Sequence, residues 1–187
     1  MQKRAMAMTL AAGLVAVAAA CGSDDNTTTP PPASKIVNLS ATLTPAGELG
    51  ASLKGDPKGS GTLTATLDTS TNVFTYNVQF TGLTSNVSLG HIHGPFIPGG
   101  TTTSAGVILN FDPAVTGSAP NATFVGLKTA TAGSATGTIT LNAATQISAT
   151  VNGDSLRKLL LAGFTYANIH TPQNGGGEIR GQITVDK

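Results

Sequence analysis

The sequence has 187 residues, of which 40% are hydrophobic and only 10% are charged, with 23 Gly and a formal net charge of +1. This length suits one domain, and the composition favours short strands and turns over a helical bundle or a disordered charged chain. No basic stripe is present, which argues against nucleic acid as a partner and against charge-driven binding to anionic lipid.

Residues 1–20 have the pattern of an export signal. Lys3 and Arg4 precede an apolar run of about 16 residues, too short for a membrane span. Ala18 and Ala20 stand just before Cys21. Small residues before a lone Cys are typical of a bacterial lipobox, so we predict that the signal is removed and that Cys21 carries the lipid. Ordinary cleavage after Ala20 is the alternative, because the residue three before a lipobox Cys is most often Leu, not Ala.

Residues 21–35 are polar and contain the run Pro30 to Pro32, which predicts an extended tether between anchor and domain. We therefore expect an exported protein whose partner includes the membrane, through its lipid anchor. Gly22 and Ser23 lack the Asp that often retains lipoproteins at the inner membrane, which favours the outer membrane. A single Cys allows no intrachain disulfide.

Residues 36–187 predict one all-β domain, because apolar and polar residues alternate with a period of two. The segment from Asp68 to Asn72 has the composition of a hairpin turn. Alternation is clearest in residues 37–44, 62–67 and 73–80, and further strands are expected at residues 88–93, 106–111, 123–127, 135–141, 146–151, 165–170 and 178–185. The spacing indicates an antiparallel β-sandwich or a partly closed barrel.

One short helix is expected at about residues 154–162. Asp154 could cap its first free N–H groups, and Gly163 suits a left-handed stop. Leu156, Leu159 and Leu160 would share one face, so the helix is expected to pack over one end of the sheet.

The three His of the chain lie in two similar settings at strand ends. His91 and His93 point to the same face of a strand, with Cα atoms roughly 6.5–7 Å apart, so that His170 could complete a three-nitrogen site. Three imidazoles would suit copper or zinc. The alternative is structural: each imidazole hydrogen-bonds a loop carbonyl and fixes the following turn. Catalytic residues are not expected, because carboxyl groups near strand ends are few and no serine nucleophile elbow is present.

Glu178 and Arg180 are one strand step apart on the same face. They could form a structural salt bridge with each other or with cross-strand neighbours. The flanking Gly177 and Gly181 suggest a close backbone approach or a bulge.

These motifs together resemble the CHRD domain, named after chordin. The first half resembles it in His91 to Pro95 and residues 106–109, and the opening is similar in residues 41–43, Glu48 and 61–68. The closing signature covers residues 164–171 and 174–183, and includes Asn168, Glu178 and Arg180. The opening lacks the usual Asn-Glu-Val-Pro-Pro-like run, which leaves the role of Glu48 open.

The resemblance implies a β-sandwich-like extracytoplasmic module with no enzymatic activity established for the family. The first hypothesis is therefore a non-enzymatic envelope lipoprotein that binds a protein, glycan or matrix ligand. The second is a copper- or zinc-binding site made by His91, His93 and His170. A looser likeness to copper–zinc superoxide dismutase, which also uses a His-x-His strand and a distant His, would extend that second hypothesis to a dismutase-like reaction, but it rests on spacing alone.

Overall fold

The computed structural model describes residues 35–187, so the predictions for the signal segment, Cys21 and most of the tether lie outside the described residues. The elements are β1 (Ile36–Leu43), the 3-10 turn η1 (Pro45–Gly47), β2 (Ser60–Asp68), β3 (Val73–Thr81), β4 (Leu89–His93), β5 (Val107–Asn110), β6 (Thr123–Val125), β7 (Gly133–Thr140), α1 (Gly153–Leu161), β8 (Thr165–His170) and β9 (Ile179–Val185). Within residues 35–187, no helix is long and apolar enough to cross a membrane.

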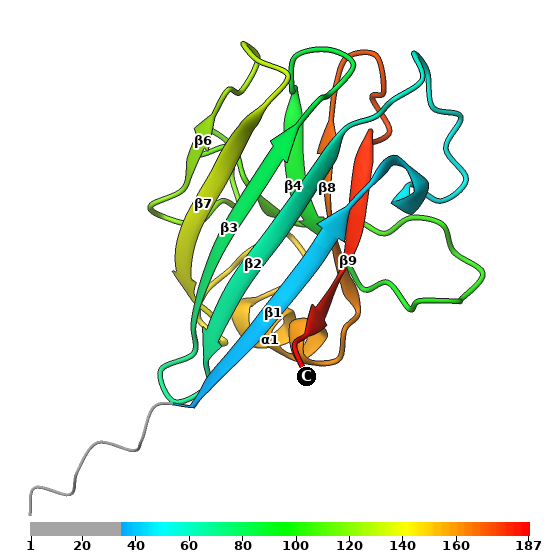
Figure 1. Cartoon of the computed structure of the whole chain (residues 1–187). Helices are drawn as coiled ribbons and strands as arrows, with labels where there is room; N and C mark the ends of the chain where they lie inside the picture. Colours follow the sequence, from blue (N-terminus) through cyan, green and yellow to red (C-terminus); the bar gives the residue numbers. More distant parts are fainter. Residues whose placement is uncertain (1–34) are drawn as a thin grey trace, which may run out of the picture. The chain divides into compact units, whose positions relative to one another are not determined.

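The strands form one antiparallel sheet in the order β5-β4-β8-β9-β1-β2-β3-β7-β6, which curls into a half-barrel (Figure 1). Strand β1 pairs with β2 along its whole length but with β9 at only two positions, and the sheet divides there into two parts. Side chains of both parts meet in one core, where the rings of Tyr76 and Phe111 lie 5.2 Å apart. The predicted all-β fold with a partly closed barrel is thus confirmed.

Alternation explains which face of each strand is buried. Along β2, Leu63 and Leu67 are fully buried in the core, whereas the threonines between them are exposed. The predicted hairpin joins β2 to β3: Asp68 Oδ1 accepts a hydrogen bond from the Ser70 backbone N–H at 2.9 Å, and Asn72 has a φ of +58°. Short polar side chains that bond the backbone and tolerate positive φ are what such a turn requires.

The predicted helix is present as α1, shifted by one residue. Its N-cap is Asn152, whose side chain accepts a hydrogen bond from the Ser155 backbone N–H at 2.9 Å. The assignment of the cap to Asp154 was wrong: this residue lies inside the first turn and pairs with basic residues one turn later. Leu156 and Leu160 are buried, and they fix α1 over one end of the barrel (Figure 1).

One expected strand, at residues 146–151, does not form. The segment is a tight loop in which the Ile147 N–H bonds the carbonyl of Val151 at 3.0 Å, and a single bridge joins Gln146 to Asn152. Ile147 and Val151 are both buried. Two buried apolar residues of a loop have the same even spacing here as residues on one face of a strand, so the sequence pattern did not distinguish the two structures.

Candidate metal centre

Strands β4, β8 and β9 place polar side chains side by side on the face opposite the core. His91 pairs with Asn168 across β4 and β8, and Asn168 pairs with Arg180 across β8 and β9. His93 and His170 lie two residues further along their strands, so they point to the same face. Residues between them, such as Ile92, point into the core.

The three predicted imidazoles come together. One nitrogen from each of His91, His93 and His170 lies within 4.8 Å of the others. His91 Nδ1 and His170 Nε2 are 3.2 Å apart. Two nitrogens bound at about 2.0–2.1 Å to a tetrahedral ion lie roughly 3.3–3.4 Å apart, so this pair already has the separation that a shared ion requires.

Backbone carbonyls set the tautomers of two of these rings. His93 Nδ1 lies 2.9 Å from the carbonyl oxygen of Ala105, and His170 Nδ1 lies 3.0 Å from that of Gly175. A carbonyl oxygen can only accept, so both Nδ1 atoms carry the proton. In the neutral ring each Nε2 then offers a lone pair, which is how imidazoles are oriented in metal centres.

Both lone pairs face the side chain of Asn168. Its Oδ1 lies 3.0 Å from His93 Nε2 and 3.0 Å from His170 Nε2. The two Nε2 atoms and Asn168 Oδ1 are all acceptors, so none of the three has a proton to donate to another. A proton on His91 Nδ1, 3.2 Å from His170 Nε2, would satisfy His170 alone and leave His93 Nε2 facing Oδ1. A cation between the groups relieves both contacts, as does an amide turned so that its NH₂ group donates to both rings.

Burial keeps the imidazoles neutral. All three His are buried, and burial lowers the pKa of each. For His91, burial together with the neighbouring His170 and His93 lowers the pKa to about 3. Protonation therefore does not resolve the conflict around Asn168 at neutral pH, and neutral imidazole is the form that binds metal.

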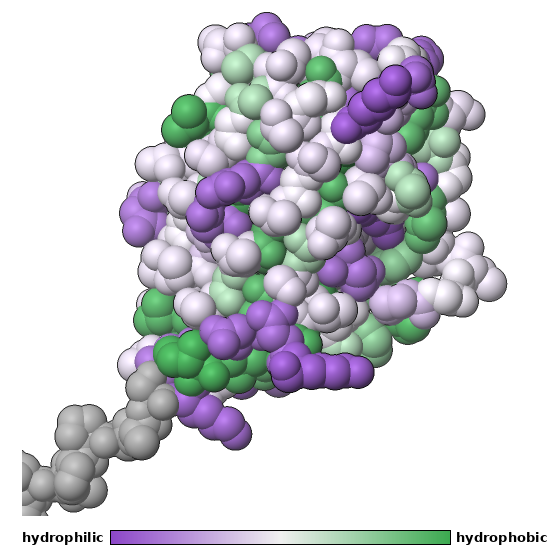
Figure 2. Space-filling model, in the orientation of Figure 1, coloured by the Kyte–Doolittle hydropathy of each residue, from purple (hydrophilic) through white to green (hydrophobic). Residues whose placement is uncertain are grey.

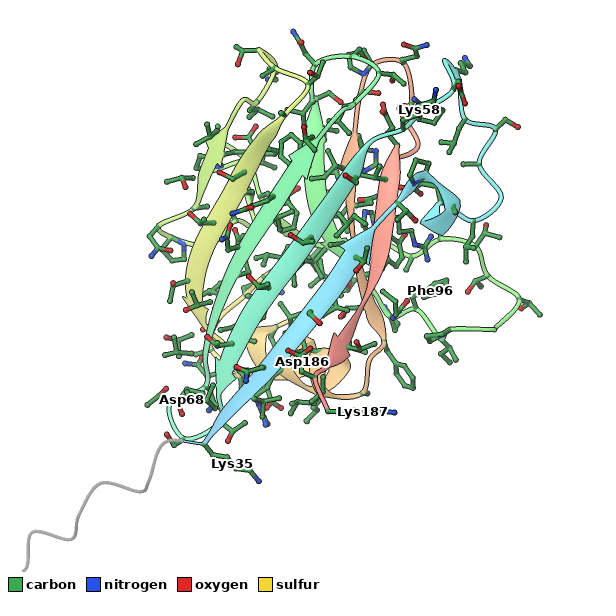
Figure 3. All side chains as sticks on the ribbon, viewed as in Figure 1. Lys35, Lys58, Asp68, Phe96, Asp186 and Lys187 are labelled. Carbon is green, nitrogen blue, oxygen red and sulfur yellow. The ribbon has the colours of Figure 1, made fainter. Side chains whose placement is uncertain are left out.

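An aromatic stack supports this face from the side. The rings of His93 and Tyr166 are stacked, with centroids 4.7 Å apart, and the Arg180 guanidinium carbon lies 3.4 Å from the Tyr166 centroid. Phe96, labelled in Figure 3 on the loop after β4, also lies over Arg180, at 4.4 Å. Sequence reasoning did not assign Tyr166 a role, although its spacing of two from Asn168 places it on the same face.

Glu48 reaches the same centre from the loop after β1. Its Oε1 lies 3.5 Å from Asn168 Nδ2, and burial raises the pKa of Glu48 to about 7 despite the opposing effects of Arg180 and Asn168. A Cβ at Gly177, which has a φ of +126°, would collide with the Glu48 carboxylate. The close approach expected at this glycine is confirmed, and its partner is a side chain of the candidate site.

Glu178 and Arg180 do not pair with each other, and that prediction is corrected. Glu178 precedes β9, and its carboxylate accepts hydrogen bonds from Thr84, Thr171 and Asn174 at 2.6–3.1 Å. Burial tends to raise the pKa of Glu178, but these hydrogen bonds outweigh it and hold the pKa below its usual range. Arg180 instead donates to the carbonyl of Thr103 at 2.7 Å and packs on the aromatic rings.

The fold and this site define an antiparallel β half-barrel with a buried three-His face. The family model of the CHRD domain matches residues 39–183, and the chain therefore belongs to the CHRD domain family. A search of curated proteins found no match.

Proposed function

We propose that this chain is an exported, non-enzymatic CHRD module that holds one copper or zinc ion between His91, His93 and His170, with Asn168 Oδ1 beside them. The observation that carries the proposal is the convergence of one nitrogen from each of the three buried imidazoles, all within 4.8 Å of one another. The carbonyls of Ala105 and Gly175 hold His93 and His170 in the tautomer that is protonated on Nδ1, which leaves each Nε2 able to bind a metal ion.

The donor set favours copper or zinc over other ions. Imidazole nitrogens suit both metals, whereas magnesium and calcium prefer oxygen ligands. Three His with one further position is an arrangement found around zinc, and copper accepts the same nitrogens. The described residues contain no thiolate at this site, because Cys21 is the chain's single Cys.

Metal binding is tested by equilibrium dialysis of the purified full chain, prepared without chelator, against copper or zinc. We expect about one equivalent of metal, and a large loss of affinity for His93→Ala and for His170→Ala. Because the chain has only three His and one Cys, few side chains outside this site can bind copper or zinc tightly. Gln173→Ala, on an exposed loop, is the matched control and should bind normally. Well under one equivalent in the wild type would overturn the proposal.

The anchor proposed at Cys21 is tested separately. If Cys21 is lipidated, globomycin blocks processing of the precursor, and Cys21→Ala gives a protein that fractionates away from membranes. An unaffected precursor would mean ordinary cleavage after Ala20. A lipid anchor would keep the domain in the cell envelope, and we propose the outer membrane as its location.

A further inference from the structure

The opposite part of the sheet has an exposed face with an unusual composition. Five strands, β1, β2, β3, β7 and β6, carry Ser, Thr, Asn and Gln as outward side chains over their middle rows, with Val125 at the β6 edge as the exception. We call this the hydroxyl face; it consists of Asn38, Ser40, Thr42, Ser60, Thr62, Thr64, Thr66, Thr75, Asn77, Gln79, Thr81, Thr123, Ser134, Thr136, Thr138 and Thr140. Figure 2 shows the molecule from this side, and much of the surface has intermediate hydropathy.

The hydroxyl face is ordered as rows across the strands. One row runs through Ser40, Thr64, Asn77, Thr136 and Thr123, which are direct cross-strand partners. Neighbouring strands are about 4.8 Å apart and alternate residues along a strand are roughly 6.5–7 Å apart, so the polar groups form a two-dimensional array. The fully buried core beneath holds this array in place.

Charge is nearly absent from these strands. Asp68, the last residue of β2, is the one charged residue in the five strands. Figure 3 shows the labelled charged side chains Lys35, Lys58 and Asp68 near the ends of the strands. From the segment after β9, Asp186 adds a carboxylate to this face, where it accepts a hydrogen bond from Ser40 Oγ at 2.6 Å. An anionic polymer would therefore meet this carboxylate and find no positive charge on the five strands.

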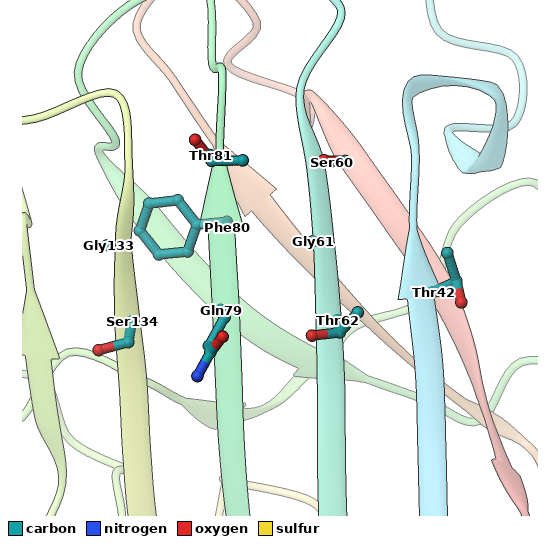
Figure 4. Close-up of a pocket in the computed structure, with 9 residues that line it drawn as sticks. All are labelled: Thr42, Ser60, Gly61, Thr62, Gln79, Phe80, Thr81, Gly133 and Ser134. Atoms are coloured by element: carbon teal, nitrogen blue, oxygen red, sulfur yellow. The ribbon is translucent and has the colours of Figure 1, made fainter.

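The hydroxyl face is hollowed. A groove of about 590 Å³ is lined by Thr62, Gln79 and Ser134 among others, with Gly61 and Gly133 in its floor and the ring of Phe80 beside them (Figure 4). A second hollow of about 300 Å³ lies further along the same strands, between Thr64 and Thr75. Both glycines are at inward-facing positions, where an added Cβ would meet core and backbone atoms, so the shape of the groove is set by the outward side chains of the neighbouring residues.

We propose that the hydroxyl face binds an uncharged polysaccharide chain, laid in this groove. Hydroxyl and amide side chains both donate and accept hydrogen bonds, which matches the hydroxyls and acetamido groups of a neutral glycan. Within residues 35–187, the side chains of Thr62, Thr64 and Gln79 have no hydrogen bond to another protein group, so they are free to make them. A protein partner would favour a cluster of exposed aromatic and apolar anchors, whereas the row through Thr62, Gln79 and Ser134 ends in a single exposed apolar side chain, Val125 at the β6 edge.

Binding is tested with the purified full chain and soluble chitohexaose and cellohexaose, with polygalacturonate as a charged comparison, by isothermal titration calorimetry. We expect binding to a neutral oligosaccharide and none to polygalacturonate. Gln79→Glu places a charge in the groove without changing its shape and should raise the Kd at least about tenfold. Gln173→Glu makes the same change on an exposed loop and should leave the Kd unchanged.

A second variant separates binding from folding. Thr62→Val with Thr64→Val keeps β-branched side chains and removes two hydroxyls, so thermal stability is retained while binding weakens. No binding to either neutral oligosaccharide, or equal binding by wild type and Gln79→Glu, would overturn the proposal. Thermal hysteresis in place of sugar binding would also overturn it, since the array would then bind ice. Metal binding is independent of each of these outcomes, because the His side chains lie on other strands.

Discussion

Replacing Glu178 by Gln tests whether the buried carboxylate beside β9 stabilises the fold. Glu178 is fully buried, and its two oxygens accept four hydrogen bonds from Thr84, Thr171 and Asn174. Hydrogen bonds to a charged group contribute about 1.5–3 kcal/mol each, against about 0.5–1.5 kcal/mol for neutral pairs. Gln loses this charge assistance and places its NH₂ group against the Asn174 NH₂ group or the Thr84 N–H. We expect a loss of about 3 kcal/mol in the free energy of unfolding.

The assay is thermal and urea unfolding of the wild type and the variant. For a domain of this size each kcal/mol lowers the Tm by about 2–4 °C, so Glu178→Gln should lower it by roughly 6–12 °C. Asp56→Asn is the matched control, because Asp56 pairs at 3.4 Å with Lys58 and both side chains are more than 80% exposed. Its effect should stay within about 0.5 kcal/mol. A loss below about 1 kcal/mol for Glu178→Gln would refute the reasoning.

The same pair of proteins gives a pH dependence. The pKa of Glu178 is lowered in the folded state, so its stabilisation is present above the pKa of the unfolded chain and is lost as the pH falls through the folded-state pKa. The stability difference between wild type and Glu178→Gln should therefore be full at pH 7 and shrink as the pH falls below about 4.3. A difference that stays constant down to pH 3 would contradict this origin.

Three further substitutions follow from the packing. Tyr76→Phe removes a buried hydroxyl that has no hydrogen-bond partner among residues 35–187, and it should leave stability unchanged or raise it by up to about 1 kcal/mol, measured by urea unfolding; a loss above about 1 kcal/mol would contradict this. Asn152→Ala removes the cap of α1 and should cost about 1 kcal/mol, whereas no loss would show that water replaces the cap. Arg180→Lys removes a planar group stacked on Tyr166 and should cost about 1–2 kcal/mol in thermal unfolding, and an unchanged Tm would remove the stack as a stabilising contact.

Most of the fold was predicted from the alternation of apolar and polar residues with a period of two. This alternation located β1, β2 and β3 with their hairpin, because in each of these strands buried residues alternate with more exposed ones. The His-containing strands β4 and β8 were also expected, although all their residues except Leu89 are buried, so exposure does not alternate along them. The same rule failed at residues 146–151. An alternating segment forms a strand only if another strand lies beside it to pair with, and the local sequence pattern gives no information on that tertiary pairing.

The sequence predicted that the three His of the candidate site lie together, but it did not predict the residues around them. Spacing placed His91 and His93 on one face, and the similar setting of His170 associated it with them. The role of Tyr166 as a ring stacked on His93 and the approach of Glu48 to Asn168 depend on strand register and on a loop conformation. Charge alone suggested that Glu178 and Arg180 would pair, but threonine hydroxyls and aromatic rings proved to be the nearer partners.

The most direct test of the central proposal is X-ray absorption spectroscopy on the full chain loaded with one equivalent of zinc or copper. A metal held by His91, His93 and His170 predicts a first shell with three imidazole nitrogens at about 2.0–2.1 Å, and the loss of one imidazole in His91→Ala. A shell of oxygen atoms without imidazole scattering, unchanged in His91→Ala, would contradict it and leave the three His as a structural network.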